Sequence, residues 1–296
     1  MDQDTDHTAQ GSQQTQRDGG AGDAPRTGRR VTAHVVRLGP DGRTPLVPAG
    51  DGPDGALAGR RVLYGGDPAE AARAAAGLPA DARVSAWDVR TEITTVAGAA
   101  GPVELHVDRL FYTEGGPAPS APRAHGATGL PCRPGAAELL AEEPERETPS
   151  LRRFASYGLV TDPEGRLLLT RIAEGFPGAG TWHLPGGGVD HGEHARAALR
   201  REIFEETGQD AGVGGVVGIA HHARNAQMGP EGAPVDIYAV WVFFHAHIAD
   251  PRPLRVTETA GSTADCAWFT PEELPGIRLS ATSRRALDAL GSDTRA

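Results

Sequence analysis

The feature that most constrains this chain is the segment between Gly187 and Gly208, which reads GGVDHGEHARAALRREIFEETG. Apolar residues recur in it at every fourth position: Ala195, Leu199 and Ile203. This period predicts a helix over about residues 193–207 with one face turned toward a core. Gly208 suits the position just past the helix end, because glycine readily adopts the positive φ found there. The segment therefore fixes one amphipathic helix and its end.

Three carboxylates of this helix share one arc of its surface: Glu202, Glu205 and Glu206. At about 100° per residue they fall within an arc of about 100°, displaced from the apolar face. Like charges at this spacing repel, at a cost of a few tenths of a kcal/mol per pair, and a divalent cation would remove that cost. Oxygen ligands without Cys or His suit magnesium or manganese. Arg201, four residues before Glu205, can hold that carboxylate in place.

The residues before the helix predict a turn. Pro185 stops regular structure, and the glycines from Gly186 to Gly188 let the backbone approach a ligand closely. A backbone carbonyl of this turn could therefore reach a cation bound by the carboxylates.

The spacing resembles the Nudix box, whose specified positions are met by Gly187, Glu193, Arg201, Glu202, Glu205, Glu206 and Gly208. The resemblance covers roughly residues 151–291 and implies an α/β fold, the Nudix-type α/β/α sandwich with a mixed sheet. Only the last box position departs from the pattern, because Gln209 stands where an aliphatic residue is usual. We expect this change to weaken a packing contact and to leave the chemistry intact.

For the site, the resemblance implies a metal-binding set made of the Gly187 carbonyl and four carboxylates: Glu193, Glu202, Glu205 and Glu206. Glu205 and Glu206 are the preferred direct ligands in this interpretation. Glu202 is the residue that deprotonates the attacking water, and Arg201 has an orienting role. Glu258, on a later loop, is a second and weaker candidate for the base.

The resemblance implies a Nudix pyrophosphohydrolase that uses magnesium, or alternatively manganese, to cleave the phosphoanhydride bond of a nucleoside diphosphate linked to another moiety. Nucleoside triphosphates, oxidised nucleotides, ADP-ribose and nucleotide sugars all stay open as substrates. Arg171 and Arg224 are candidates to clamp phosphates, and three aromatic residues to stack on a base: Phe176, Trp182 and Tyr238. Each of these residues is more often a surface ion pair or a core aromatic. The alternative is a non-catalytic Nudix-fold nucleotide sensor or partner-binding protein.

The composition narrows the classes of binding partner that this chain can have. The formal net charge of −10 disfavours nucleic acid as a partner, because surfaces that follow phosphate backbones are normally basic. All 29 basic residues are arginine, which excludes a lysine Schiff base. No apolar stretch approaches the roughly 20 residues of a membrane span, so we expect a cytoplasmic protein without a membrane partner. Homodimers are common in the family, and the oligomeric state stays open here.

The chain divides into four segments by composition. Residues 1–30 are polar without apolar periodicity and predict a disordered tail. Residues 31–115 alternate strand-like runs with one short helical pattern, which predicts a small α+β domain, either unrelated or a degenerate Nudix unit with Glu70 as the only carboxylate in the place of the box. Residues 116–150 are rich in Pro and Gly and predict a linker. Residues 151–292 form the expected Nudix domain.

Overall fold

The structure, a computed structural model, describes residues 26–39, 45–46, 55–115, 129–144, 146–228, 233–258 and 261–293. The predicted disordered tail lies outside these residues as far as residue 25. Its last five residues instead begin the first strand, because Arg29 and Arg30 are held by hydrogen bonds to the rest of the chain.

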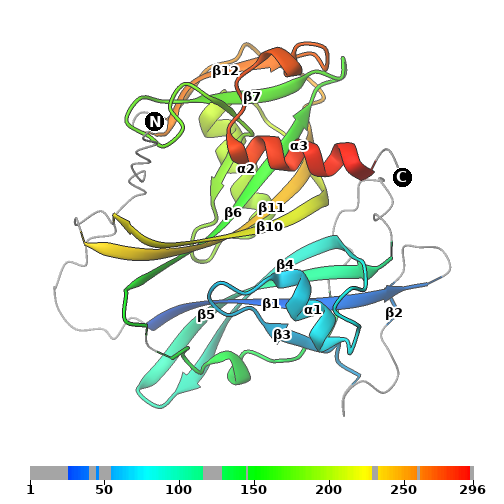
Figure 1. The fold of residues 1–296 in the computed structure, drawn as a ribbon, viewed down its shortest axis with the longest axis vertical. Helices are drawn as coiled ribbons and strands as arrows, with labels where there is room; N and C mark the ends of the chain where they lie inside the picture. The colour runs from blue at the N-terminus through cyan, green and yellow to red at the C-terminus, as the bar shows by residue number, and fades with distance from the viewer. Residues whose placement is uncertain are drawn as a thin grey trace.

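The first half of the molecule is a five-stranded sheet with one helix (Figure 1). Its elements are β1 (Arg26–Leu38), β2 (Pro45–Leu46), β3 (Gly59–Arg61), α1 (Pro68–Ala75), β4 (Val84–Gly98), β5 (Gly101–Glu114) and the 3-10 turn η1 (Ala137–Leu139). The strand order is β2-β1-β5-β4, with β3 paired to β1. β1 and β5 run parallel, and β4 and β5 form a long antiparallel hairpin. The Asp67 side chain caps α1 by accepting a hydrogen bond from the Ala69 amide.

The end of the predicted linker belongs to this sheet. Leu130 and Leu139 are buried on the face of the sheet opposite α1, and Leu57 forms a β-bridge with Cys132. Two buried apolar anchors attach to the sheet a segment whose proline and glycine content suggested a free connection. The connection between the halves is therefore shorter than the sequence predicts.

The second half is a seven-stranded mixed sheet. Its elements are β6 (Ser150–Thr161), β7 (Leu167–Ile172), β8 (Trp182–His183), β9 (Gly186–Gly188), α2 (Ala195–Thr207), β10 (Gly212–Met228), β11 (Pro234–His247), β12 (Thr263–Phe269), the 3-10 turn η2 (Leu274–Gly276) and α3 (Ala281–Asp293). The order is β10-β11-β6-β7-β12, with β9 paired to β6 and β8 to β7. β6 and β11 run parallel, and the other pairs are antiparallel.

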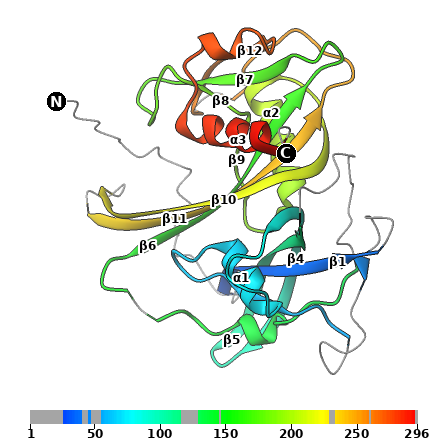
Figure 2. The ribbon, with the colours of Figure 1, turned by 45° about the vertical axis from the view of Figure 1, so that its right-hand side comes forward.

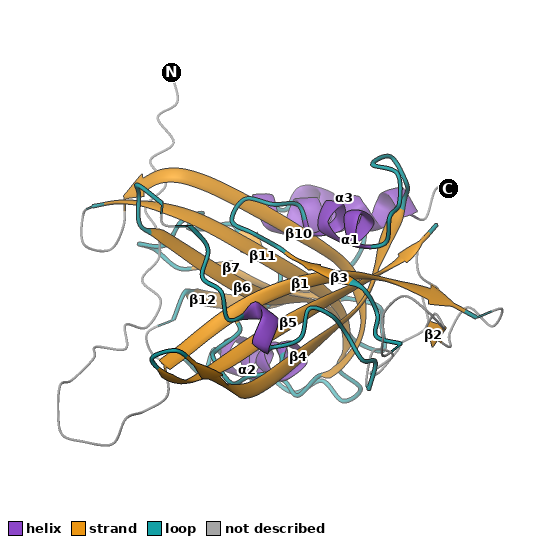
Figure 3. Ribbon diagram, turned by 90° about the horizontal axis from the view of Figure 1, so that it is seen from below, coloured by secondary structure: helices purple, strands orange, loops and turns teal. Residues whose placement is uncertain are grey.

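Helices cover both faces of this second sheet. Val160 and Leu168 share a buried cluster with the apolar face of α2, whereas Leu159 and Leu169 share one with Ala286 of α3. Alternate residues of one strand thus pack on opposite helices, as the two-residue period of a strand requires. Figure 3 shows α2 and α3 on opposite sides of the strands. The predicted α/β/α sandwich with a mixed sheet is confirmed.

The two sheets repeat one topology. In each half a central strand pairs in parallel with a later strand, and that later strand pairs with an antiparallel neighbour (β1, β5 and β4; β6, β11 and β10). In each half a short strand next to the central one, β3 or β9, leads into the helix α1 or α2. This shared order favours the interpretation of the first half as a Nudix-like unit.

The halves pack against each other through a common core. One buried cluster contains Val89, Leu110 and Tyr112 of the first sheet together with Phe154 and Val240 of the second. Figure 2 shows β4 running beneath β10, where the two sheets meet. Among the described residues, no helix combines the length and the apolar character needed to cross a membrane.

Candidate active site

The glycine turn lies against the helix that carries the glutamates. β9 pairs with β6, with Gly187 opposite Ser156 and Gly186 opposite Tyr157. Gly186 has a φ of 137°, and a Cβ on it would lie 2.2 Å from the Ser156 carbonyl oxygen. A Cβ on Gly187 would lie 2.8 Å from the carboxylate of Glu202. Glycine is therefore required at Gly186, whereas a side chain at Gly187 would displace the Glu202 carboxylate, so the turn approaches that carboxylate as closely as the sequence predicts.

Helix α2 presents its apolar face as the period predicts. Ala195, Leu199 and Ile203 are at most 2% exposed, and Gly208 ends the helix with a φ of 71°. The predicted helix is confirmed, except that it begins two residues later than Glu193. Glu193 belongs to the preceding turn, in which its amide donates to the Asp190 carbonyl oxygen.

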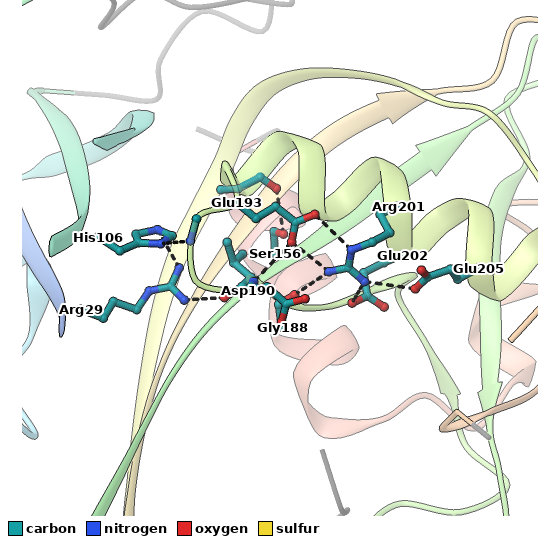
Figure 4. Close-up of polar contacts among 12 residues, drawn as sticks. Arg29, His106, Ser156, Gly188, Asp190, Glu193, Arg201, Glu202 and Glu205 are labelled. Carbon is teal, nitrogen blue, oxygen red and sulfur yellow. Dashed lines mark hydrogen bonds and ion pairs between the residues drawn. The ribbon is translucent and has the colours of Figure 1, made fainter. Parts of the chain in front are cut away.

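Arg201 connects three of the carboxylates. Its guanidinium donates to Glu193 at 3.0 Å, to Glu202 at 2.9 Å and to Glu205 at 3.1 Å. It also donates to the Gly188 carbonyl oxygen at 3.1 Å, so that one cation ties the glycine turn to the helix (Figure 4). This crowd of carboxylates raises the pKa of Arg201, with the hydrogen bond to Glu193 as the largest contribution.

Glu206 points into the protein and is 5% exposed. Its carboxylate accepts hydrogen bonds from the Gly186 amide at 2.9 Å and from the Thr263 hydroxyl at 2.8 Å. Burial, followed by the charge of Glu202, raises its pKa to about 8 against the lowering effect of these hydrogen bonds. Glu206 therefore anchors the glycine turn to the helix from the inside.

Glu202 lies between Arg201 and the glycine turn. Burial raises its pKa to about 7, although Arg201 lowers it, and the charges of Glu205 and Glu258 raise it further. A carboxyl group with this pKa exchanges its proton near neutral pH. Glu202 thus has the electrostatic setting of a group that handles protons.

The later loop brings Glu258 to the same place. The Glu258 amide donates to the Glu205 carbonyl oxygen at 3.1 Å, and its carboxylate accepts from the Thr263 amide at 3.1 Å. The charge of Glu258 raises the pKa of both Glu202 and Glu206. The sequence named Glu258 only as a weak candidate, and the fold places it beside the box helix.

The carboxylates of this site have the chemistry of ligands for a divalent cation, but their present arrangement does not form a complete metal site. The donors are all oxygens, and two of the carboxyl groups are buried and repel each other, which a hard cation would relieve. Among the described residues, however, no group of three or more His, Cys, Asp or Glu side chains is placed to hold a metal ion as it stands. Arg201 occupies the space between Glu193, Glu202 and Glu205 instead.

Comparisons with known proteins identify the family. The chain is 32% identical over 133 residues to a nucleoside triphosphatase, NudI, of Escherichia coli O139:H28, a match that covers 43% of this chain and 89% of that protein. A family model described as NUDIX domain matches residues 151–290. The chain belongs to the Nudix family.

Other relatives of this Nudix protein match over a similar length. It is 28% identical over 151 residues to a MutT-like protein of Streptomyces ambofaciens, covering 51% of this chain and 85% of that one. Among solved structures, a MutT protein from Methanosarcina mazei Go1 matches with a TM-score of 0.37 and 23% identity, covering 51% of this chain and 97% of that one.

The last box position of the Nudix domain has a different role from the one predicted. Gln209 is fully buried, and its side chain accepts from the Arg252 amide at 2.9 Å and donates to the Arg252 carbonyl oxygen at 3.0 Å. The glutamine therefore pins the start of the loop that leads to Glu258. The expectation of a weakened packing contact stays a prediction, and the polar side chain has paired hydrogen bonds at this buried position.

The predicted substrate-binding residues make other contacts. Arg171 pairs with Asp265 at 3.3 Å, and the Trp182 ring packs edge-on against Phe269 with ring centroids 4.8 Å apart. Arg224, far along β10, donates to His222 at 2.8 Å. Tyr238, also considered for base stacking, is 3% exposed, which excludes that role in this arrangement. The ligand contacts of the first three residues stay a prediction.

Sequence reasoning missed the residues that the first sheet contributes. Arg29 of β1 and His106 of β5 reach the turn between Gly188 and Glu193 (Figure 4). The only signal available in the sequence was an arginine at the edge of the supposed tail and a histidine within an apolar strand pattern. Neither residue has a spacing that points to the box.

Proposed function

We propose that this Nudix protein hydrolyses the phosphoanhydride bond of a nucleoside diphosphate derivative with the help of a divalent cation, magnesium or manganese. The observation that supports this most is the crowding of Glu202, Glu206 and Glu258 beside the glycine turn, where the charge of Glu202 raises the pKa of Glu206 and the charge of Glu258 raises the pKa of both. Crowded carboxylates are costly for a fold, and a cation shared with phosphate oxygens offsets that cost.

The chain offers a specific set of groups to hold the cation. Glu206 and Glu202, with the Gly187 carbonyl, lie nearest the turn, and Glu205 and Glu258 adjoin them. Arg201 holds Glu205 and Glu193 in place, so Glu193 supports the set more than it extends it. A bound cation would supply Lewis-acid stabilisation of the charge on the phosphate oxygens and a lowered pKa for a bound water.

Glu202 is the residue we propose to take the proton from the attacking water. A general base is most effective when its pKa lies near the working pH, and the pKa of Glu202 is about 7. Glu258 stays a second candidate because it lies beside the same residues. The oxygen of that water would bond to phosphorus while the phosphoanhydride bond breaks and a phosphate-bearing group leaves, so no covalent intermediate on the protein is needed.

A second function is favoured by one specific observation. Arg201 already neutralises three carboxylates, and no chelating group of three side chains exists among the described residues. A protein that binds a nucleotide without turning it over would need no more than this. It would act as a sensor or as a partner-binding protein.

The full chain should be incubated with magnesium and a panel of nucleoside triphosphates, oxidised nucleotides, ADP-ribose and nucleotide sugars, with detection of released phosphate and pyrophosphate. Nucleoside triphosphates come first because the E. coli relative is named as a triphosphatase. We expect turnover that is lost in both Glu205→Gln and Glu206→Gln. Wild-type rates in both variants would contradict the metal assignment, and tight binding without turnover would favour the sensor.

A further inference from the structure

We infer that Arg29 and His106 of the first sheet are positioning residues for the active site of the second half. They hold the loop Val189–Gly192, which joins the glycine turn to the box helix. The inference rests on the proposed function, because it concerns the geometry in which that reaction would occur. It assigns the first half a role as a built-in partner of the hydrolase half.

Two hydrogen bonds attach the backbone of the loop to the first sheet, and the side chain of His191 adds a half-exposed ion pair with Glu104 of β5 at 2.8 Å. The Arg29 guanidinium donates to the Val189 carbonyl oxygen, and the Gly192 amide donates to Nδ1 of His106 at 3.1 Å. The two side chains stand next to each other because Arg29 on β1 and His106 on β5 are register partners in the parallel pair. Both ends of a four-residue loop are thus fixed by one pair of neighbouring side chains.

The side chains that hold the loop are themselves immobilised. His106 and Asp108 are fully buried, and Asp108 accepts from Arg29 at 2.7 Å, from the Thr91 hydroxyl at 3.0 Å and from Nε2 of His106 at 3.1 Å. Burial alone would raise the pKa of Asp108, but the hydrogen bond from His106 and the charge of Arg29 bring it below its usual value. Asp108 is therefore a carboxylate that locks both residues.

This network also sets the tautomer of His106. Nδ1 accepts a hydrogen bond from the Gly192 amide, which assigns the ring proton to Nε2; Asp108 lies 3.1 Å from Nε2 and can accept it, and Nη2 of Arg29 lies at the same distance. A histidine held in one tautomer by a buried carboxylate is a fixed acceptor. That is the property a positioning residue needs.

The loop lies between two groups of the active site. The Arg201 guanidinium donates to the carbonyl oxygen of Gly188, just before the loop, and to the carboxylate of Glu193, just after it. A shift of the loop would therefore move Gly188 and Glu193, and through them Arg201. Because Arg201 also pairs with Glu202 and Glu205, these two carboxylates would move as well. Displacements of about 1 Å can reduce turnover by about a hundredfold.

The second half makes the corresponding contact with the loop before the helix of the first half, so this kind of contact occurs twice in the interface. Tyr238 of β11 donates to the Gly66 carbonyl oxygen, in the loop that joins β3 to α1, at 2.5 Å. Tyr238 and Arg152 are register partners, as His106 and Arg29 are. Each parallel strand pair thus reaches the loop that precedes the helix of the other half. Such reciprocal contacts are typical of paired, similar subunits.

Each half also contacts the first turn or the cap of the helix in the other half. Arg196, in the first turn of α2, donates to Asp88 at 2.7 Å and to the Val89 carbonyl oxygen at 3.1 Å, both on β4. In the other direction, His221 of β10 lies 3.9 Å from Asp67, the residue that caps α1. The interface therefore bears on both helix starts, and only one of them leads to a cluster of glutamates.

The test uses the full chain with two variants, His106→Ala and Arg29→Met, and three readouts: kcat, KM, and the hydrogen exchange of amides 188–193. We expect kcat to fall about tenfold or more with KM within about twofold, and the Gly192 amide to exchange at least about tenfold faster. His106→Asn keeps an acceptor near the position of Nδ1 and should restore most of both values. Arg29 is partly exposed, so Arg29→Met decides the question if His106→Ala does not fold.

The matched control is Glu104→Gln, which removes the charge of the half-exposed pair between Glu104 and the His191 side chain of the same loop and leaves the two backbone hydrogen bonds of the loop in place. Wild-type turnover and exchange are expected in this variant. Faster exchange with unchanged kcat, or no change in either readout in His106→Ala and Arg29→Met, would overturn the inference. If the wild-type chain shows no turnover with any substrate, the proposed function fails, and the exchange of Gly192 still decides whether His106 holds the loop.

Discussion

The two halves of the molecule share an order of strands, but their helices differ. Helix α2 has 13 residues and carries the glutamates of the box, whereas α1 has 8 residues and a single carboxylate, Glu70, which is exposed. Both helices are followed by a glycine with positive φ, Gly208 or Gly77. The comparison teaches that the strand topology of this fold does not depend on the carboxylates, which one half has and the other lacks.

The interiors of the halves also differ. The centre of the first sheet buries polar side chains, among them His34, His106, Asp108 and Arg109. The corresponding strands of the second sheet bury Phe154, Val240, Val242 and Phe244. Buried polar groups need fixed partners, so they specify position more than they add stability. The central strands of the first half thus hold buried polar side chains in fixed positions, whereas those of the second half form a mainly apolar core.

The largest expected effect is a loss of kcat/KM when a carboxylate is removed from α2 but not when one is removed from α1. Glu206→Gln should reduce kcat/KM by about a hundredfold or more, because it removes a charge that we assign to the cation. The matched change in the other helix, Glu70→Gln, should leave kcat/KM unchanged. Steady-state kinetics on the substrate found in the panel measures both. Equal losses in the two variants would mean that the helices are not as different as their sequences indicate.

The next effect tests whether the halves are one folding unit. Leu199→Ala in α2 and Leu110→Ala in β5 each remove a fully buried side chain from the common core cluster. Each should lower the free energy of unfolding by about 3 kcal/mol, and each should shift a single cooperative transition. Calorimetry or denaturant unfolding followed by tryptophan fluorescence reports this. Two separate transitions, each sensitive to only one variant, would show independent halves.

A smaller effect concerns the residue after each helix-ending glycine. Gln209 follows Gly208 in the second half, and Leu78 follows Gly77 in the first. Gln209→Leu would make the two positions alike but would leave the amide and carbonyl of Arg252 without their partners. We expect a loss of about 1–2 kcal/mol in the free energy of unfolding. An unchanged stability would indicate that the loop before Glu258 does not depend on Gln209.

The last effect is a pH dependence that one residue of the second half, Glu206, contributes. A carboxyl group whose pKa is raised on folding stabilises the fold below its unfolded pKa, and this contribution is lost as the pH rises through the folded value. For Glu206 that window runs from about 4.5 to about 8. In metal-free protein, wild type should therefore lose a few degrees of thermal midpoint relative to Glu206→Gln between pH 5 and pH 9. A difference that stays constant with pH would contradict the raised pKa.

The sequence predicts the features that depend on local pattern. The period of Ala195, Leu199 and Ile203 predicts α2, and Gly208 predicts its end, because these signals act within one helix. The carboxylates of the box are evident from their spacing alone.

The sequence does not predict the features that depend on contacts between distant segments. Glu258 joins the site only because the loop backbone bonds to the end of α2, and Arg29 joins the loop 160 positions later along the chain. Leu130 and Leu139 are buried although their surroundings have the composition of a linker. Composition and spacing carry no information about which surface meets which, so these contacts become visible only in the folded chain.

The common core has a practical consequence for anyone who wishes to isolate the Nudix half. A fragment cut at residue 151, where the family match begins, would leave Phe154 and Val240 without the side chains of Val89, Leu110 and Tyr112 that cover them. Such an exposed apolar surface promotes aggregation. The boundary given by homology is thus not a boundary of stability, and the shortest useful recombinant protein should start before Arg26.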